Sequence, residues 1–265
     1  MRTFFFLLLP ILLLHAKEYY AKAEPYEVRT IASNVAGQVL FADETKEGAM
    51  LDGEAFVILD DELDKTELKS IAGKLELLQL TLELNRKLQV NYEETLKRKQ
   101  ENYERIKDLK IKSSLEKDKE FYDLIASQNA LIGVEKEIAS LQTQINDLLL
   151  RKAQLERSLR DKHLSAKGMV LYDLLVKEGQ VVTIATPLAK VADISKAMLT
   201  LYLSQEDAAS AKQKVLYLNG KKSGYAFARI WDIADEQHLS SYKAQIIIDA
   251  PKRFSSLIKV ELRDE

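Results

Sequence analysis

Few residues of this 265-residue chain have the types and spacing that catalysis or metal binding requires. There is no cysteine, which excludes thiol catalysis, cysteine-based zinc sites and disulfides. The three histidines, His15, His163 and His238, are far apart in the sequence, and we expect each to be structural or solvated. Neither a phosphate-binding glycine loop nor a Gly-x-Ser-x-Gly elbow occurs. The sequence therefore predicts a protein that is not an enzyme and has no metal site and no cofactor.

The densest acidic group, Asp60, Asp61, Glu62 and Asp64, has a structural explanation. It stands at the start of a long predicted helix, where carboxylates interact favourably with the positive end of the helix dipole. His163 ends the following helical stretch, where a cation would face the negative end of a dipole. We therefore expect these side chains to stabilise helix ends and not to bind a metal.

The N-terminus has the features of a secretory signal. Arg2 precedes an apolar run over 4–14, which is too short to span a bilayer and matches a signal core. We predict a signal peptide over 1–23, with cleavage after Ala16 or after Ala23, and a soluble mature chain in the periplasm. The alternative is an uncleaved membrane anchor. The formal net charge of −2 gives no basic surface, so we expect no nucleic-acid partner.

The segment 61–162 is predicted to be helical, since it has no proline and only two glycines. Apolar residues recur at alternating steps of three and four, which is typical of a coiled coil. The predicted seam comprises Leu68, Ile71, Leu75, Leu78, Leu82, Asn85, Gln89, Tyr92, Leu96, Lys99, Tyr103 and Ile106, and then Leu124, Ser127, Leu131, Val134, Ile138, Leu141, Ile145, Leu148, Lys152, Leu155 and Leu159.

The seam loses its apolar character between these two series, which separates two helices of similar length. Ser113 and Glu116 have the spacing of a capping box, which predicts a new helix start there. We therefore expect an antiparallel α-helical hairpin over 61–162 with its tip near 110–115, and arms of about 70 Å at 1.5 Å per residue. The alternative is one continuous rod that dimerises in parallel.

One short pattern occurs twice, as VAGQVLFADETKEG at 35–48 and as AKGMVLYDLLVKEG at 166–179. Each copy has the alternation of a half-buried strand and the glycines of tight turns. Neither half has enough apolar surface to fold alone, so we expect the hairpin to bring both halves into one β-sandwich over 24–60 and 163–194. The predicted turn glycines are Gly37, Gly48, Gly53, Gly168 and Gly179, with positive φ expected at Gly48 and Gly179. In the second half, Ala185 occupies the position that corresponds to Gly53 in the first half.

Residues 195–265 alternate as β-strands, with a short helix in SQEDAASAK and with Trp231 expected in the core or at a barrel end. The paired Gly-x-Val…Lys-Glu-Gly segments, DGEAFVILDD, ATPLAKVADIS and the hairpin together resemble the HlyD-type periplasmic adaptor family, also called membrane fusion proteins. The resemblance covers nearly all of the predicted mature chain. It implies an elongated, multi-domain α+β protein in which the hairpin is inserted into a split lipoyl-like domain and a β-barrel domain follows. Ala185 departs from the family pattern at one turn.

The family resemblance also implies partners. Such adaptors connect an inner-membrane transporter of the RND or ABC type to a TolC-type outer-membrane duct, and they assemble as a ring or funnel. A membrane-proximal domain is expected to be absent or minimal here, which would leave pump contact to the barrel, near 219–224. Two alternatives are an exported coiled-coil spacing protein without a transport role and, with less support, a carrier-domain subunit of an enzyme.

At the predicted tip, RIKDLKIKSSLEKD is similar to the Arg-Leu-Ser pattern with which such adaptors meet their duct. The corresponding residues are Arg105, Leu109, Ser113 or Ser114, and Asp118, although the step from Leu to Ser is shorter than in the family pattern. A four-residue step would place Arg105 and Leu109 on one helix face. Leu109 would then enter a groove of the duct while Arg105 donates hydrogen bonds to it. The alternative is that Arg105 is solvated, Leu109 closes the seam and the serines only cap the second helix.

Overall fold

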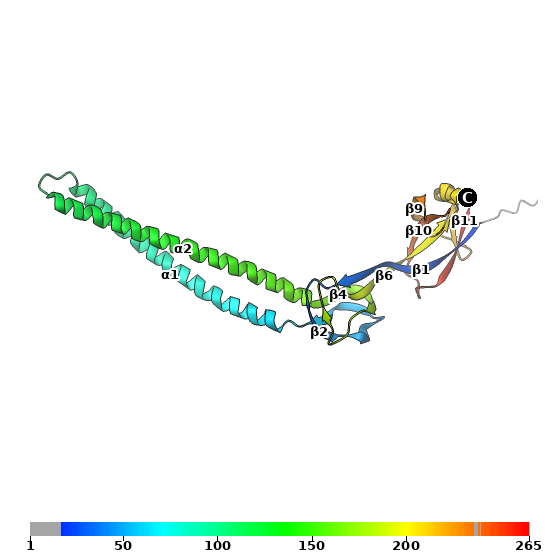
Figure 1. The fold of residues 1–265 in the computed structure, drawn as a ribbon. Coiled ribbons are helices and arrows are strands. Elements are labelled where there is room, and N and C mark those ends of the chain that lie inside the picture. Colours follow the sequence, from blue (N-terminus) through cyan, green and yellow to red (C-terminus); the bar gives the residue numbers. More distant parts are fainter. Residues whose placement is uncertain (1–16, 236–237, 239, 265) are drawn as a thin grey trace, which may run out of the picture.

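The computed structural model describes residues 17–235, 238 and 240–264 and shows three parts in a row (Figure 1). A long helical hairpin forms one end, a first β unit follows in the middle, and a second β unit forms the other end. The apolar core of the predicted signal peptide lies outside the described residues, whereas residues 17–23 lie within them. The elongated shape places the two ends of the molecule far from each other, so each end can contact a different partner.

The hairpin consists of α1 (Glu62–Ile106) and α2 (Ser114–Lys162), which confirms the predicted pair of helices. Every predicted seam residue is buried or half-buried, and Ile71, Leu75, Ile145 and Leu155 form its most buried cluster. Ser113 caps α2 in a complete capping box with Glu116, as the spacing predicted. The two helices pack against each other within one molecule, so the continuous rod is excluded.

The first β unit contains β2 (Gly37–Ala42), β3 (Met50–Leu59), β4 (His163–Leu174) and β5 (Val181–Val182), with a 3-10 turn η1 (Glu44–Lys46). Parts of β1 (Lys17–Ala32) and β6 (Pro187–Leu203) complete it, in the order β5-β2-β3-β4-β6-β1. Its core takes buried residues from both sides of the hairpin, among them Val39, Phe56 and Leu59 from the first side, and Leu171, Leu188 and Val191 from the second. The two halves therefore share one core, which explains why the hairpin must return to its starting point.

The two copies of the repeat are bonded to each other across this unit. The backbone N–H of Gly48 donates to the carbonyl of Leu171 over 2.8 Å, and the N–H of Gly179 donates to the carbonyl of Val39 over 2.8 Å. Both glycines have positive φ, at 78° and 86°, as predicted. Gly37, in contrast, opens β2 outside the left-handed region, where an added Cβ would lie 3.4 Å from the Cβ of Leu59. That distance is an ordinary van der Waals contact, so neither φ nor close packing requires a glycine at this position.

Ala185 adopts a left-handed conformation with φ at 67°, and Gly53 in the first half has φ at 104°. The departure from the family pattern therefore leaves the turn in place. It puts an L side chain in a backbone region that costs about 1–2 kcal/mol for residues other than glycine.

The second β unit contains β7 (Val215–Leu218), β8 (Lys221–Lys222), β9 (Phe227–Ala234), β10 (Tyr242–Asp249) and β11 (Leu257–Arg263). The helix α3 (Gln205–Ser210) and a 3-10 turn η2 (Ala211–Gln213) follow β6, as SQEDAASAK predicted. Strands pair in the order β6-β1-β11-β7-β8, with β10 between β6 and β9. Trp231 is half-buried, and the centre of its ring lies 5.3 Å from the guanidinium of Arg229 and 5.2 Å from the ammonium of Lys243. It is therefore not a core residue.

Two strands run through both β units, which changes the predicted boundaries at 24 and 195. β1 pairs with β11 over 17–22 and with β6 from Ala23 onward, while β6 extends from the first core into the second. Between Pro25 and Glu27 the register of β1 against β6 shifts, which marks the junction. The sequence interpretation assigned 1–23 to a signal peptide, so it did not consider 17–23 as part of a strand, whereas Ala21 and Ala23 lie in the second core.

Candidate docking site at the hairpin tip

The tip loop is positioned by hydrogen bonds at both helix ends. The N–H of Lys107 donates to the carbonyl of Tyr103 over 3.0 Å, and the N–H of Leu109 donates to the carbonyl of Ile106 over 3.0 Å. On the other side, the Ser113 N–H donates to a Glu116 carboxylate oxygen over 3.0 Å. Backbone groups at the end of α1 and at the start of α2 therefore have hydrogen-bond partners. These bonds limit the conformations of the loop residues between them.

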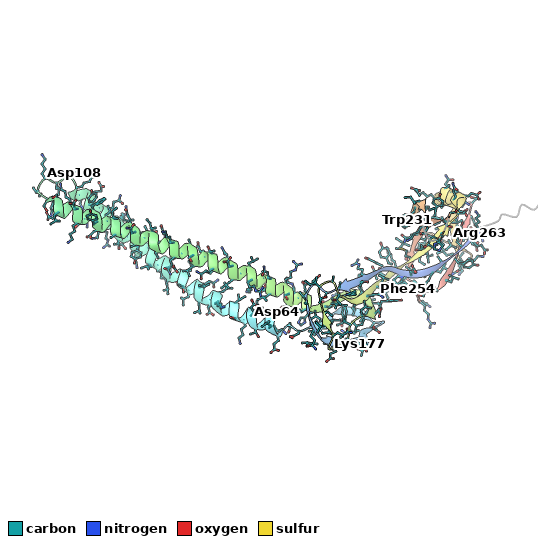
Figure 2. The ribbon with its side chains drawn as sticks, in the orientation of Figure 1. Asp64, Asp108, Lys177, Trp231, Phe254 and Arg263 are labelled. Carbon is teal, nitrogen blue, oxygen red and sulfur yellow. The ribbon has the colours of Figure 1, made fainter. Side chains whose placement is uncertain are left out.

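The loop and the first turn of α2 present apolar side chains to solvent. Ile111 is 88% exposed, Leu115 is 78% exposed and Leu109 is 42% exposed. They stand among the lysines of a short polar segment, far from either β core (Figure 2, where Asp108 labels this end). Exposed large apolar residues gathered at the end of a long arm are typical of a contact surface for another protein.

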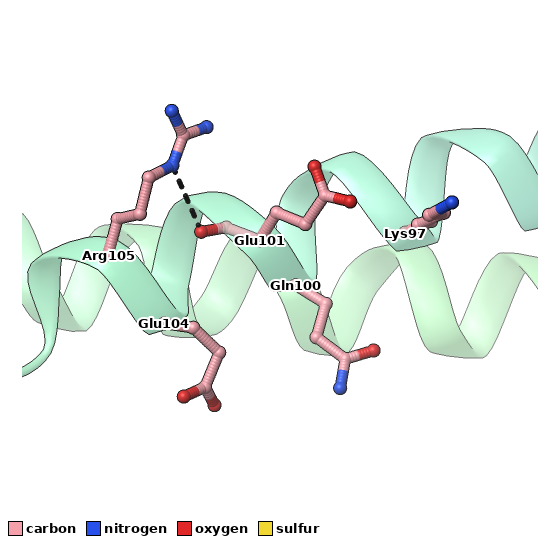
Figure 3. A pocket seen from close by; sticks show the side chains of 5 residues that line it. All are labelled: Lys97, Gln100, Glu101, Glu104 and Arg105. Carbon is pink, nitrogen blue, oxygen red and sulfur yellow. Dashed lines mark hydrogen bonds between the residues drawn. The ribbon is translucent and has the colours of Figure 1, made fainter.

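Arg105 lies in the last turn of α1 and is held along its own helix. Its Nε donates to the carbonyl oxygen of Glu101 over 3.2 Å (Figure 3). Its guanidinium also donates to the side-chain oxygen of Asn102 over 2.5 Å. Arg105 borders a surface hollow on α1 whose other lining residues are Lys97, Gln100, Glu101 and Glu104 (Figure 3). Because this hollow lies along a single helix and is lined by charged and polar side chains, it has no enclosed, apolar volume for a small ligand.

One prediction about this site is wrong. Arg105 and Leu109 do not share a helix face, because α1 ends at Ile106 and Leu109 lies in the loop. The prediction that Arg105 and Leu109 share a face required a helix that continues to 109. The apolar seam that stabilises α1 ends at Ile106, three residues earlier. Leu109 is also too exposed to serve as a closed end of the seam, which the alternative had assumed.

Of the remaining predicted tip residues, Ser113 is the N-cap and Ser114 is the first residue of α2. Asp118 lies one turn later and is exposed. The structure adds Ile111 and Leu115, which the sequence analysis did not single out. A sequence signal for them exists: they are bulky apolar residues in a stretch that is otherwise lysine, serine and acid, outside the seam spacing.

A layer of aromatic side chains supports the tip from below. The rings of Tyr103 and Phe121 lie 5.6 Å apart across the two helices, and Tyr122 follows Phe121 at 5.9 Å. Lys99 of α1 forms an ion pair with Asp123 of α2 at 3.1 Å. In the same stretch of α2, one carboxylate oxygen of the half-buried Glu120 is buried without a hydrogen-bond partner.

At the other end, charged residues fix α2 to α1. Asp64 accepts hydrogen bonds from Ser158 at 2.6 Å and from Lys162 at 3.0 Å. Burial is the largest single influence on the Asp64 carboxyl and raises its pKa, but these bonds outweigh it and hold the pKa below the ordinary value. Glu67 and Arg151 add a two-pronged pair at 2.7 and 2.8 Å.

Asp61 ties the start of α1 to the end of α2. It contacts Nε2 of His163 at 2.6 Å and Nζ of Lys65 at 2.8 Å. Burial again raises the Asp61 pKa most, and the bonds from Lys65 and His163 bring it below the ordinary value. Asp61 therefore ties the start of α1 to His163, the first residue of β4.

Several solved structures have a fold similar to that of this chain. MacA from Actinobacillus actinomycetemcomitans superposes with a TM-score of 0.64 at 17% identity, covering 93% of this chain and 79% of MacA. The membrane fusion protein Spr0693 from Streptococcus pneumoniae R6 gives a TM-score of 0.64 at 9% identity, covering 94% of this chain and 100% of its own. A MacA–MexA chimera that contains the α-hairpin domain of Pseudomonas aeruginosa MexA gives 0.54 at 16% identity, covering 94% and 82%.

The chain has the fold of the membrane fusion proteins. At these identities the likeness extends to the fold and no further, and it includes the hairpin and both β units because more than nine-tenths of the chain is covered. No protein-family model and no curated protein sequence matches the chain. Within 17–235, 238 and 240–264, no helix is long and apolar enough to cross a membrane.

Proposed function

We propose that this protein is a non-catalytic periplasmic adaptor of the HlyD type, which links an inner-membrane transporter of the RND or ABC type to a TolC-type outer-membrane duct. The observation that carries the proposal is the exposed apolar tip, with Ile111 and Leu115, at the end of a clamped hairpin of about 70 Å. The first β unit corresponds to the lipoyl-like domain and the second to the barrel domain. An exported spacing protein is the less favoured function, because the chain has the fold of membrane fusion proteins.

In this proposal the tip enters the duct and the opposite end faces the pump. Arg105 and Ser114 flank the apolar side chains and can donate hydrogen bonds to carbonyls of the duct. At the other end of the molecule, the β7–β8 turn at Asn219 and Gly220 precedes two exposed lysines, Lys221 and Lys222. Crosslinking from this turn to an inner-membrane partner tests the pump contact, and a barrel without any such crosslink would contradict it.

The duct contact is tested with a double variant, Ile111→Glu and Leu115→Glu, in a binding assay with the purified TolC-type channel. Burial of one large apolar side chain contributes about 1.5–3 kcal/mol, so losing two should weaken binding by about 100-fold or more. Val90→Glu is the matched control, since Val90 is an exposed apolar residue on α1 away from the tip. Unchanged helical circular dichroism would show that both variants are folded.

Retention of full binding and full export by the tip variant would refute the docking role of these side chains. The same assay with Arg105→Asp combined with Leu109→Ser tests the residues that the sequence pattern singled out. Loss of binding in Val90→Glu as well would show that the whole shaft, and not its tip, contacts the duct.

A further inference from the structure

A hollow lies at the joint between the two β units. It is lined by residues of β1, β4 and β6 and by the loop between β10 and β11, and its volume is about 490 Å³. Pockets for small ligands have volumes of about 300–1,000 Å³ and occur preferentially where two domains meet. The position and size of this hollow, which we call the joint pocket, are therefore those of a ligand site.

The floor of the joint pocket is an apolar row across three strands. Val28 of β1 is paired with Ala192 of β6, and Ala192 is paired with Val170 of β4. Side chains of directly paired residues project from the same face of a sheet. That face is turned away from the first core, because Val191, the neighbour of Ala192, lies in that core and Ala192 does not. The sheet therefore offers an apolar surface that no core of this chain covers.

Aromatic side chains stand around this floor. Tyr26 on β1 and Tyr172 on β4 both line the joint pocket, and Tyr172 is 64% exposed. Phe254 approaches from the second β unit, where its ring also packs against the second core (Figure 2). Pockets that bind small molecules are lined mostly by such aromatic and apolar side chains, with few polar groups.

The wall that carries Phe254 is held in place by backbone hydrogen bonds. The N–H of Ser255 donates to the carbonyl of Ala23 over 2.7 Å, and the N–H of Ala23 donates to the carbonyl of Ser256 over 2.9 Å. Ser255 has φ at 65°, a left-handed conformation that is unfavourable for residues other than glycine. The loop is therefore fixed to β1, and the joint pocket is formed before any ligand arrives.

One rim of the joint pocket carries two opposite charges that are free to meet a ligand. Lys22 and Glu24 both line it, and both are exposed. Within the part of the chain that the structure describes, neither of them forms an ion pair. The third charged lining residue, Glu27, is already bonded to Arg29 through two contacts of 2.6 Å. The available charges are thus one ammonium and one carboxylate, about 7 Å apart along the strand.

We propose that the joint pocket binds a short apolar peptide of about two residues with free termini. Its ammonium faces Glu24, its carboxylate faces Lys22, and its side chains rest on the floor at Val28 between the aromatic walls. Two extended residues span about 7 Å, which matches the separation of the two rim charges. From Glu24 to Val28 the strand covers only about 13 Å, so a long acyl chain would pass beyond the floor.

The inference goes beyond the proposed adaptor function and needs neither the duct nor the pump. Because the lining comes from both β units, an occupant also holds these units together at their joint.

Calorimetric titration of the purified exported chain with the dipeptide phenylalanyl-leucine tests the site. Tyr172→Ala should weaken binding by at least about 10-fold, since it removes an aromatic wall. Tyr20→Ala is the matched control, because Tyr20 is an equally exposed tyrosine of β1 that does not line the joint pocket, and it should bind as wild type does. Circular dichroism shows whether each variant is folded, and Val28→Asn provides the same test if Tyr172→Ala is not.

Blocked forms of the same dipeptide test the two rim charges. Glu24→Gln should weaken binding of the free dipeptide by about 2- to 5-fold, as for an exposed ion pair, but leave binding of its N-acetyl form unchanged. Lys22→Met should likewise weaken binding of the free dipeptide and leave binding of its C-terminal amide unchanged. Equal losses for the free and the blocked forms would overturn the assignment of the termini.

Three results would overturn the site or its ligand. These are the absence of any heat of binding, wild-type affinity in folded Tyr172→Ala and Val28→Asn variants, and tighter binding of dodecylphosphocholine below its micelle concentration, which would replace the peptide by a zwitterionic lipid. The tip variant Ile111→Glu with Leu115→Glu should bind the dipeptide as wild type does. Failure of the adaptor function is therefore distinguishable from failure of this site.

Discussion

Replacing Tyr19 with phenylalanine removes one hydroxyl group from the partners of a buried carboxylate. The Asp207 side chain is 4% exposed and accepts a hydrogen bond from the Tyr19 hydroxyl at 2.5 Å. Lys17 at 3.1 Å, Ser204 at 3.0 Å and Lys214 at 3.3 Å complete its surroundings. Burial is the largest influence on the Asp207 pKa and raises it, but the hydrogen bonds, with that from Tyr19 first among them, bring it below the ordinary value.

The expected loss follows from the kind of bond removed. A hydrogen bond to a charged group contributes about 1.5–3 kcal/mol. The aromatic ring of Tyr19 remains packed against the second core in the variant, so little apolar burial is lost. We therefore expect Tyr19→Phe to destabilise the second β unit by about 2 kcal/mol, which lowers its Tm by roughly 10 °C for a unit of this size.

Fluorescence of Trp231 during thermal unfolding is the assay, because the chain has a single tryptophan and it lies on β9 of the same unit. Tyr20→Phe is the control, since Tyr20 is the next residue on β1 and is 59% exposed. Its stability should stay within about 0.5 kcal/mol of wild type.

The pH dependence provides a further check on the cause. The pKa of Asp207 is lowered in the folded state. The stability that its carboxylate contributes is therefore fully present above the pKa of the unfolded chain, near 4, and is lost as pH falls through the folded-state pKa. The difference between wild type and Tyr19→Phe should therefore shrink below about pH 4. A variant as stable as wild type at pH 7 would refute a stabilising role for the Tyr19–Asp207 hydrogen bond.

The same contacts favour one of the two predicted cleavage points, that after Ala16. Cleavage after Ala23 would remove the six residues that pair with β11 and the Lys17 and Tyr19 partners of Asp207. We therefore expect the intact mass of the exported protein to correspond to a chain that begins at Lys17. A mass that begins at Glu24 would show that the mature second β unit lacks this strand.

Three further outcomes follow from single positions. Ala185→Gly should stabilise the first β unit by about 0.5–1 kcal/mol, since relief of left-handed backbone strain exceeds the cost of the greater entropy of the unfolded chain, and Gly53→Ala should destabilise it. Calorimetry of both variants measures this, and an Ala185→Gly variant less stable than wild type would contradict it. Glu120→Leu should stabilise the half of the hairpin next to the tip by about 1 kcal/mol, because it removes a half-buried carboxylate with one oxygen that has no hydrogen-bond partner. Unchanged hydrogen exchange near the tip would contradict this. The hairpin base should loosen on acidification below about pH 4, because the pKa values of Asp61 and Asp64 are lowered in the folded state and the stability that their carboxylates contribute disappears as pH falls through them. Helical circular dichroism against pH measures this, and a helix signal that stays constant as pH falls through this range would contradict it.

Much of the hairpin could be predicted from the sequence, because its signals are local or periodic. Every residue of the predicted seam is buried or half-buried, and the Ser113–Glu116 spacing located the start of α2. The end of α1 was harder to predict, since a charged sequence such as RIKDLKIK carries no stop signal. Leu109 was consequently placed on the helix when it lies in the loop, and the exposed Ile111 and Leu115 were overlooked.

The β units show what only the tertiary structure decided. The repeat in the sequence has a spacing of 131 residues, which aligns Val39 with Val170, yet the buried counterpart of Val39 is Leu171. Register shifts after Val39 in β2 and after Leu171 in β4 account for irregular alternation, because each extra residue turns the following side chains to the other face. The sequence by itself determined that two half-motifs meet through a helical hairpin. Which residues enter each core, and that β1 and β6 serve both, depended on pairing between strands far apart in the chain, which no local pattern records.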